Sequence, residues 1–295
     1  MTTPPTGEAA DTVLLSIVVG VRSSEVDPTA CLQSIRSQLR DGVELIVVGD
    51  RTDGTEDVDG VVHIEADGLV PELWARGLRM ARGELVALTA GSVVPEPDWV
   101  DRLVSMRSRD AAVVGGAIEG SRSLQTTDWA VYFCRYTPYM LPLPSGTDVE
   151  VPGDNAVYRR EILDRHRDLF TDAFWEPFIH RVLRDEGHDL VLDPDLVVRQ
   201  APGMSVGGFV RQRFRHGLSH GRMRSEGLTR RRILVEALSV PLVPPLMVAR
   251  AGRNVIRRRR HLGRFLRSLP VLVLFTTAWA VGEFVGRLRA AAGRT

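Results

Sequence analysis

The sequence of 295 residues contains no lysine, so all 38 of its basic residues are arginines. It has only two cysteines, Cys31 and Cys134, and both stand in apolar or aromatic surroundings. Two such cysteines are too few for the disulfide framework of a small secreted protein, and they favour a reducing compartment. We expect small buried side chains rather than a disulfide or a metal pair. Residues 1–10 also lack the basic and then apolar pattern of a secretory signal.

Acidic residues are nearly absent from the last third of the chain. Residues 1–207 hold 19 arginines and 34 acidic residues, a net charge of −15, whereas residues 208–295 hold 19 arginines and 3 acidic residues, a net charge of +16. The two halves sum to the formal charge of +1. A basic segment interleaved with apolar runs is typical of a surface that faces an anionic membrane. The acidic body argues against nucleic acid as a partner of these arginines.

No uninterrupted apolar run reaches the roughly 20 residues that cross a bilayer as a helix. The run 233–249 contains three prolines, and the run 269–282 has 14 residues before Glu283. Extending the second run to Val285 makes it long enough to span but includes that carboxylate. Either run is expected to span, re-enter or lie in the interface, where each arginine near an anionic surface contributes about 1 kcal/mol. A soluble helical bundle is the alternative.

The first hundred residues alternate between apolar runs and helical patterns. Residues 13–20 and 43–49 are continuous apolar runs, typical of strands buried on both faces of a parallel sheet. Further strands are expected at 61–65 and 85–88, and helices at 29–39 and 72–82. This order predicts an α/β fold with a mostly parallel sheet, which binds its ligands at the carboxyl ends of the strands.

The pattern beyond residue 110 is less regular. The aromatic block 128–139 is either core packing or a surface that stacks on a sugar ring. We expect strands at 113–119 and 190–198, the second interrupted by Asp-Pro-Asp, and helices at 155–165 and 178–186. The predicted domains are an α/β domain over 12–205, a basic juxtamembrane segment over 206–232, and an apolar, arginine-rich helical region over 233–295.

Several motifs, taken in order, resemble the glycosyltransferases of family 2 over residues 14 to about 217. The segment 16–22 is similar to that family's opening strand, and 47–55 is similar to its Val-Asp-Asp-x-Ser-x-Asp-Gly-Thr motif, shortened by one residue. The resemblance implies a GT-A fold, a nucleotide-diphospho-sugar donor and inversion at the anomeric carbon. It places Gly20, Arg22 and Asp50 at the donor.

Asp50 would accept a hydrogen bond from the nucleobase or ribose, because a carboxylate at a strand end can accept two donors at once. An Asx turn is the alternative for Asp50, and the following Asp53-Gly54 is expected to be a turn.

The metal-binding Asp-x-Asp motif of that family has no carboxylates in this chain. The two positions are Thr89 and Gly91, which end an apolar run. Mg²⁺ and Mn²⁺ prefer hard oxygen ligands that include carboxylates. Three interpretations are open: arginine neutralises the leaving diphosphate, another acid such as Asp154 holds a metal, or catalysis has been lost. Arginine suits bidentate phosphate contacts, so we assign Thr89 and Gly91 to the donor and no residue to a metal.

Two later segments resemble the acceptor side of the family. Residues 151–160 are similar to its Gly-x-Asn-x-x-x-Arg segment, in which Asp154 and Asn155 would hold sugar hydroxyls. The alternative is a turn followed by a helix cap. Residues 174–181 fall where the family carries Trp-Glu followed by a helix, and Pro177 suits the first helical position.

An inverting transfer needs one base that removes the proton of the acceptor hydroxyl. Glu176 is the residue assigned to this role, with Trp175 beside it on the acceptor side. His180, one turn later, would orient Glu176 or contact phosphate, and a structural histidine is the alternative.

Residues 210–217 resemble the Gln-x-x-Arg-Trp block of membrane-associated members, with His216 in place of tryptophan. The resemblance implies that Arg215 lies near the donor diphosphate and Gln212 near the acceptor. A lipid-facing basic helix accounts for the block equally well.

The sequence therefore predicts an enzyme at the cytoplasmic face of the cell membrane. It would transfer a sugar from a nucleotide sugar to a lipid-linked or cell-envelope glycan acceptor. A degenerate transferase that serves as a membrane-bound nucleotide-sugar or glycan-binding subunit is the first alternative. A purely structural amphipathic membrane protein is the second.

Overall fold

The computed structural model describes residues 13–23, 25–50, 61–147 and 150–293, and they fall into two compact units. The chain passes between the units several times. The first unit comprises residues 1–23, 28–117 and 144–198, and the second comprises residues 24–27, 118–143 and 199–295. The second unit therefore includes the aromatic block, which the predicted boundary at residue 205 assigns to the α/β domain.

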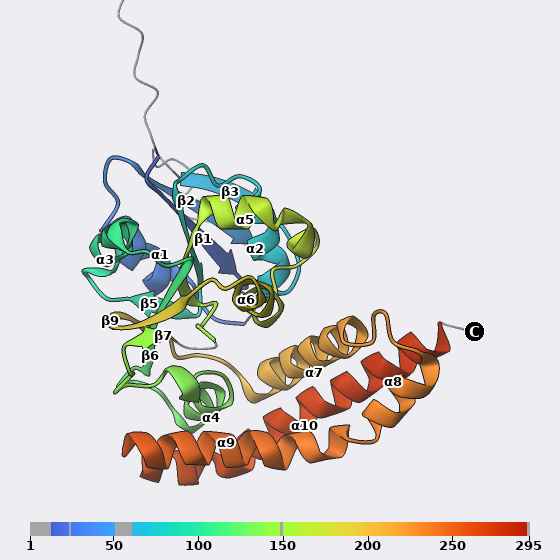
Figure 1. The fold of residues 1–295 in the computed structure, drawn as a ribbon. Coiled ribbons are helices and arrows are strands. Elements are labelled where there is room, and N and C mark those ends of the chain that lie inside the picture. Colours follow the sequence, from blue (N-terminus) through green and yellow to red (C-terminus); the bar gives the residue numbers. More distant parts are fainter. Residues whose placement is uncertain (1–12, 24, 51–60, 148–149, 294–295) are drawn as a thin grey trace, which may run out of the picture. The chain divides into compact units, whose positions relative to one another are not determined.

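The first unit is a mixed α/β fold around a sheet of nine strands among the described residues (Figure 1). The strand order is β3-β2-β1-β4-β8-β6-β9-β5, and β7 pairs with β9. The strands are β1 Leu15–Val21, β2 Val43–Gly49, β3 Val61–Glu65, β4 Leu85–Ala90, β5 Val93–Pro95, β6 Val113–Gly120, β7 Gly146–Thr147, β8 Asn155–Arg159 and β9 Leu190–Gln200. The helices of this unit are α1 Thr29–Arg36, α2 Val70–Leu78, α3 Trp99–Ser105, α5 Arg160–Arg165 and α6 Glu176–Asp185.

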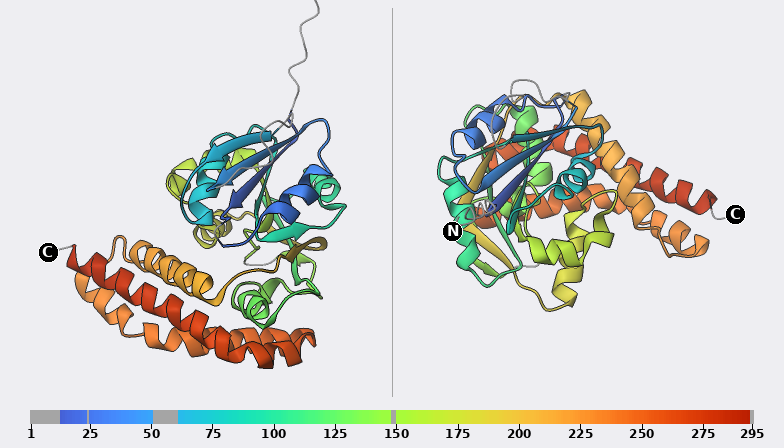
Figure 2. Two further views of the ribbon diagram at one scale, coloured as in Figure 1. Left: turned by 180° about the vertical axis from the view of Figure 1, so that it is seen from behind. Right: turned by 90° about the horizontal axis from the view of Figure 1, so that it is seen from above.

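The parallel half of the sheet agrees with the prediction from the apolar runs. β1 is parallel to β2 and β4, and β2 is parallel to β3. Every residue of β1 and β4 is buried, because helices cover both faces: α1 and α3 lie on one side, and α2 and α5 on the other (Figure 2). The α/β fold with a mostly parallel sheet is thus confirmed, and it brings the carboxyl ends of these strands to one edge.

The segment 155–165, predicted as a helix, begins instead as a strand. β8 is antiparallel to both β4 and β6, and α5 starts only at Arg160. Asn155, Ala156, Val157 and Tyr158 are all buried. A β-branched and an aromatic side chain suit a pleated strand between two neighbours, and the ladder with those neighbours satisfies the buried backbone groups.

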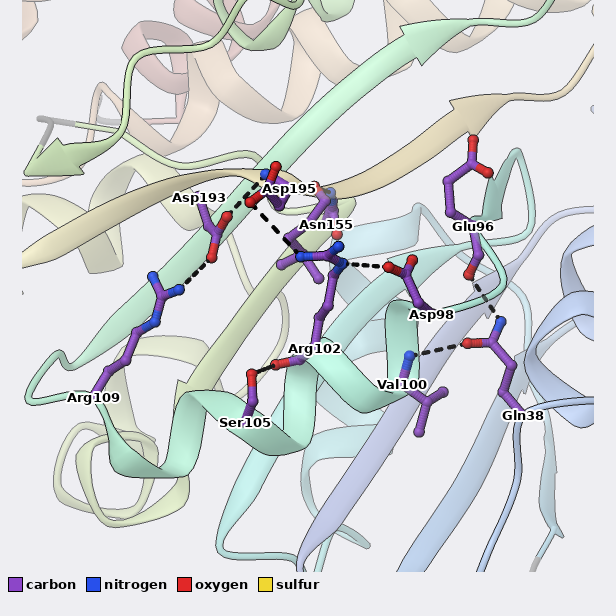
Figure 3. A network of polar contacts seen from close by, with 11 residues as sticks. Gln38, Glu96, Asp98, Val100, Arg102, Ser105, Arg109, Asn155, Asp193 and Asp195 are labelled. Carbon is purple, nitrogen blue, oxygen red and sulfur yellow. Dashed lines mark hydrogen bonds and ion pairs between the residues drawn. The ribbon is translucent and has the colours of Figure 1, made fainter.

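Strand β9 runs through Asp-Pro-Asp without the predicted interruption. Asp193 forms an ion pair with Arg109 at 2.6 Å and accepts the backbone N–H of Asp195 at 2.9 Å (Figure 3). Arg102 on α3 pairs with Asp98 at 2.6 Å and lies 3.8 Å from the Asp195 carboxylate. The two aspartates of the motif therefore connect β9 to α3 and to the residues that follow it.

The second unit is helical. Its helices are α4 Thr126–Arg135, α7 Val206–Met223, α8 Arg230–Ala237, α9 Val243–Arg258 and α10 Leu262–Ala292. Trp129, Tyr132 and Phe133 on α4 are buried, and the Trp129 ring centroid lies 5.3 Å from that of Tyr132 and 5.5 Å from that of Phe133. Core packing, the first of the two interpretations of the aromatic block, is therefore confirmed for these three side chains.

Helices α7 and α10 lie side by side (Figures 1 and 2) and approach closely at two pairs of glycines. The pairs are Gly217 with Gly221 on α7 and Gly282 with Gly286 on α10. A Cβ added at any of the four would overlap backbone atoms of the other helix. Glycines four residues apart share one helix face, and this small-xxx-small spacing is typical of closely packed membrane helices.

Two stretches, Arg230–Arg258 and Leu262–Ala292, are long and apolar enough to cross a membrane by length and composition. The second is one helix of 31 residues that includes the run 269–282 and continues past Glu283. The carboxylate of Glu283 is buried and pairs with Arg287 at 2.8 Å. Neutralisation by a neighbour one turn away explains why an acidic residue does not end this apolar helix.

Valine at position 282 should destabilise the second unit, because its side chain must displace the backbone of α7. Overpacking costs about 1–3 kcal/mol and occasionally more, so we expect thermal unfolding of Gly282→Val, followed by circular dichroism in detergent, to shift several degrees lower. Gly263→Val on the same helix is the control, since no atom lies within 4 Å of an added Cβ there. Equal unfolding temperatures for the two variants would contradict the close approach.

Candidate active site

Two of the predicted donor residues lie directly after adjacent strands. Asp50 follows β2, and its Oδ1 accepts the backbone N–H of Ser23 at 2.8 Å and the Ser23 hydroxyl at 3.1 Å. Arg22 follows β1 and donates through its guanidinium to the carbonyl oxygen of Gly68. The two side chains thus shape the turns at the carboxyl edge of the sheet, where α/β folds bind ligands. Asp53 and Gly54 lie outside the described residues.

Thr89 and Gly91 lie at the end of β4, between β1 and β8. The Thr89 hydroxyl donates to the carbonyl oxygen of Asp154 at 2.9 Å, and its own carbonyl accepts the indole N–H of Trp74 at 2.7 Å. The backbone N–H of Gly91 donates to the Gly20 carbonyl at 2.9 Å. These contacts bring the segment that carries the metal in the resembling family against β1, α2 and the start of β8.

The segment 89–92 does not fit the carboxylate set that Mg²⁺ and Mn²⁺ prefer. Both oxygens of Thr89 already make hydrogen bonds, and Gly91 has no side chain. Within the part of the chain that the structure describes, no group of three or more His, Cys, Asp or Glu side chains lies close enough to hold a metal ion.

Gly153 is the point where three segments of the first unit meet. A Cβ built on this residue would lie 3.0 Å from the carboxyl carbon of Glu176 and 3.0 Å from the ring of Trp74. Both distances are tighter than most real Cβ contacts, so a side chain at 153 would require Glu176 or Trp74 to move by a few tenths of an ångström. The Glu176 carboxylate, the indole of Trp74 and the Gly153–Asp154 backbone therefore share one location.

Glu176 is the first residue of α6. Trp175 is the N-cap and Pro177 the second helical residue, so the helix starts one residue earlier than predicted. The macrodipole of a helix stabilises a carboxylate in its first turn. Glu176 and Trp175 are half-buried, which combines partial exclusion of water with access to a ligand.

Asp154 and Asn155 stand side by side in the chain but have different surroundings. Asp154 is 6% exposed, and its carbonyl holds Thr89. The Asn155 amide is fully buried: it donates to the carbonyl oxygens of Ala117 at 3.0 Å and Leu196 at 2.9 Å, and accepts the Trp99 indole N–H at 2.8 Å. These contacts give Asn155 a structural role at the centre of the sheet; an acceptor-binding role in addition stays a prediction.

His180 is fully buried on α6. Its Nδ1 lies 2.9 Å from the Glu150 carboxylate, and its Nε2 lies 2.9 Å from the hydroxyl of Tyr158, on whose ring it stacks. The histidine therefore connects α6 to β8. These contacts favour the structural alternative for His180 over the orientation of Glu176.

Gln212 and Arg215 belong to the second unit. Gln212 is buried and donates to the Glu25 carboxylate at 2.5 Å. Arg215 is exposed, whereas its neighbour Arg213 is buried, donates to the Gln212 amide oxygen at 3.1 Å and lies over the Phe209 ring. Burial lowers the pKa of Arg213. The roles of Gln212 and Arg215 stay predictions.

Two residues with central positions were missed from the sequence. The resemblance singled out Arg215, but helical periodicity places Arg213 on the face of α7 that also carries Phe209 and Gly217. The other residue is Trp74, which lies on the buried, apolar face of α2. The apolar pattern of this helix was the signal that the sequence offered for it.

A known protein is similar to this chain in sequence. The chain is 25% identical over 173 residues to the protein named "Putative glycosyltransferase EpsH" of Bacillus subtilis (strain 168), over 53% of this chain and 50% of that protein. The sequence match supports a glycosyltransferase. It spans only about half the length of that relative. No family model matches the chain.

A solved structure is also similar. It is the mannosyltransferase PcManGT from Pyrobaculum calidifontis in complex with GDP-Man and Mn²⁺. The TM-score is 0.48 at 18% identity, over 97% of this chain and 77% of that one.

Alanine in place of Asn155 should destabilise the first unit, because three buried groups lose their partner at once. A buried donor or acceptor left unsatisfied costs about 1–3 kcal/mol, so we expect the free energy of unfolding in urea to fall by about 3 kcal/mol or more. Gln33→Ala, at an exposed position on α1, should change it by less than about 0.5 kcal/mol. A stable Asn155→Ala protein with altered acceptor use would instead assign this residue to the site.

Proposed function

We propose that this protein is an inverting glycosyltransferase that moves a sugar from a nucleotide-diphospho-sugar to a lipid-linked or cell-envelope glycan acceptor at the cytoplasmic face of the membrane. The observation that carries the proposal is the meeting of Glu176, Trp74 and the Thr89–Asp154 contact at Gly153. It joins a potential base to the carboxyl ends of the parallel strands, where a nucleotide is expected.

In the proposed reaction, the Glu176 carboxylate removes the proton of the acceptor hydroxyl. The freed oxygen attacks the anomeric carbon from the face opposite the diphosphate, so the configuration inverts and the nucleoside diphosphate leaves. Trp175 and Asp154 would hold the acceptor, and Asp50 and Gly20 the nucleoside. The half-buried position of Glu176 supports this role, because a general base is more effective in a site from which water is partly excluded.

Negative charge develops on the leaving diphosphate during the reaction. Cationic groups that are already in position before the reaction stabilise this charge best. We assign this role to arginine rather than to a metal held at 89–92, because the oxygens of Thr89 are already engaged. Arg22 directly follows β1 at the carboxyl edge, and Arg215 is assigned to the donor by the resemblance alone. Arginine carries its charge at all physiological pH values and matches the geometry of phosphate oxygens.

The surface of the second unit supports the membrane association that we propose. Most of the exposed large apolar side chains of the described residues lie on α8, α9 and α10, where Val235 and Ile256 are each at least 60% exposed. Leu238 and Leu242, between α8 and α9, are exposed to a similar extent. Exposed arginines alternate with them on α9 and the start of α10. Apolar side chains next to cationic ones are typical of a segment that enters an anionic bilayer surface.

Glutamine in place of Glu176 should abolish transfer while leaving the fold and donor binding intact. Loss of a general base costs about 10²–10⁴-fold in turnover, so we expect a fall of this size in nucleoside diphosphate release. Glu161→Gln, at an exposed position on α5, should retain full turnover. Unchanged turnover in Glu176→Gln would reject this residue as the base.

A degenerate transferase that binds a nucleotide sugar without turning it over is the second candidate. The absence of carboxylates at positions 89 and 91 favours it. Titration of a panel of nucleotide sugars with and without EDTA, followed by a turnover assay, separates the two candidates. Metal-independent binding with turnover supports the enzyme, and binding without turnover supports the subunit.

Removing charge from α9 should weaken binding to anionic vesicles. Each arginine near the surface contributes about 1 kcal/mol, so three substitutions should weaken binding roughly 100-fold. The comparison is co-sedimentation of the full-length protein with phosphatidylglycerol vesicles. The variant carries Arg250→Gln, Arg253→Gln and Arg257→Gln, and its matched control carries Arg76→Gln, Arg165→Gln and Arg181→Gln. Equal binding of the two proteins would show that α9 does not contact the bilayer.

A further inference from the structure

Helix α10 of the second unit carries a stripe of exposed apolar side chains along most of its length. Its exposed large apolar residues, from Leu262 to Leu288, fall within an arc of roughly 120° around the helix axis, and they extend over roughly 40 Å. A helix that crosses a bilayer and a helix that lies in its surface both present such a stripe to lipid. The contacts on the opposite side of α10 distinguish the two positions.

Helix α7, which belongs to the same unit, packs against that opposite side. Gly282 and Gly286 of α10 closely approach the backbone of α7, and Phe275 packs on Phe209 with ring centroids 4.5 Å apart. The three α10 residues lie roughly 160° around the helix axis from the middle of the stripe. Their contact with α7 covers residues 275–286 and so includes the middle of α10 (Figure 2). A position of α10 across the bilayer would therefore take α7 into the hydrocarbon with it.

Helix α7 is basic along this contact. Arg211 lines the same groove as Leu274 and Val281 of α10, and Arg215 is exposed one turn further along α7. If α10 crossed a bilayer, both arginines would lie next to its middle. Each arginine at the bilayer centre lowers the equilibrium constant for insertion roughly 100-fold. The packing of α7 therefore opposes a position of α10 across the bilayer.

The other apolar stretch of this unit is not one regular helix. Helix α8 ends at Ala237, and a short 3-10 turn over Val240–Leu242 separates it from α9. The prolines at 241, 244 and 245 lack the N–H group that would continue the helical hydrogen bonds. In hydrocarbon the backbone groups at such a break have no water to bind, whereas at a bilayer surface water and lipid phosphate are available to them. This stretch therefore also suits the surface.

We propose that α8, α9 and α10 lie in the plane of an anionic bilayer surface, with the α10 stripe among the upper acyl chains and α7 on the water side, and that neither apolar stretch crosses the bilayer. The inference rests on the membrane association proposed above and specifies its geometry. An amphipathic helix in this position is buried about 5–10 Å into the boundary between headgroups and acyl chains. The exposed Arg267 borders the stripe and lies level with the lipid phosphates.

The first test measures the depth of the stripe in phosphatidylglycerol vesicles. The full-length protein with Cys31→Ala and Cys134→Ala receives one cysteine at a time, which is labelled with an NBD fluorophore. The variants are Leu266→Cys, Val273→Cys, Val281→Cys and Leu288→Cys, all at exposed positions of the stripe. Quenching is compared between lipids brominated on the upper part and on the lower part of the acyl chain.

We expect upper-chain bromine to quench all four labels at least about twofold more strongly than lower-chain bromine, as a depth of about 5–10 Å requires. The control is Arg222→Cys, at an exposed position of α7, whose label should be quenched least by either lipid. Stronger quenching of the labels at 273 and 281 by lower-chain bromine overturns the proposal, because the middle of α10 would then lie in the bilayer centre.

The second test determines on which side of the membrane the two ends of α10 lie. Gly263→Cys and Gly293→Cys, in the same cysteine-free background, are treated with a membrane-impermeant maleimide in membrane vesicles of both orientations from the expression host. No atom lies within 4 Å of an added Cβ at Gly263, so this substitution should not disturb the helix. We expect both cysteines to be labelled in the same vesicle orientation. Labelling in opposite orientations shows that α10 crosses the membrane and overturns the proposal.

Co-sedimentation and nucleotide-sugar turnover, measured on the same protein, separate failure of this inference from failure of the proposed function. Vesicle binding with the labels at 273 and 281 deepest overturns the in-plane geometry alone. Turnover by a protein that does not sediment with the vesicles overturns the membrane association, and the in-plane geometry with it, and leaves the transferase. The expected depth profile in a protein that neither binds nor turns over a nucleotide sugar overturns the transferase and leaves the geometry.

Discussion

The candidate site of the first unit depends on the missing side chain of Gly153. The carboxyl carbon of Glu176 and the indole of Trp74 both lie 3.0 Å from the position that a Cβ of this residue would take. Trp74 in turn holds the carbonyl of Thr89, whose hydroxyl holds the backbone of Asp154. Four segments that are distant in the sequence are thus fixed by one chain of contacts. A side chain at 153 would push Glu176 or Trp74 away from this location.

The second unit buries two charged side chains on an apolar helix. Helix α10 is long and apolar, yet it contains Glu283 and Arg287, both nearly fully buried. Arg287 pairs with Glu283 and also with Glu236 of α8, each at 2.8 Å. A buried ion pair adds little net stability compared with apolar packing, but removing one partner is costly. We infer that the pairing specifies how α8 packs on α10, while exposed arginines elsewhere keep the positive charge outward.

The sequence predicted those parts of the fold that local pattern decides. β1, β2 and β4 are continuous apolar runs because helices cover both faces of the sheet, and their ends agree within two residues. The segment 155–159 was predicted wrongly because five residues are too short to show a periodic pattern, and its strand state comes from pairing with β4 and β6.

The site could be predicted only in part, for a related reason. Glu176 and Thr89 were assigned through resemblance to known motifs, and their roles stay predictions. Trp74, Gly153 and Arg213 contact other protein groups, and motifs of ligand-binding residues do not include such positions. The close approach of Gly153 to Glu176, 23 residues along the chain, is visible only when both are placed in space.

The hydrogen bond of Thr89 also bears on how the site handles charge. Its hydroxyl donates to a carbonyl oxygen at 2.9 Å. An aspartate in this position is an acceptor only when ionised, so it would face that carbonyl with no proton between them, and the carboxylate would be repelled from the strand end. The backbone around β4 and β8 is therefore arranged for a donor at position 89. Under the reaction proposed above, the charge of the diphosphate would then be met by arginine, because the sequence contains no lysine.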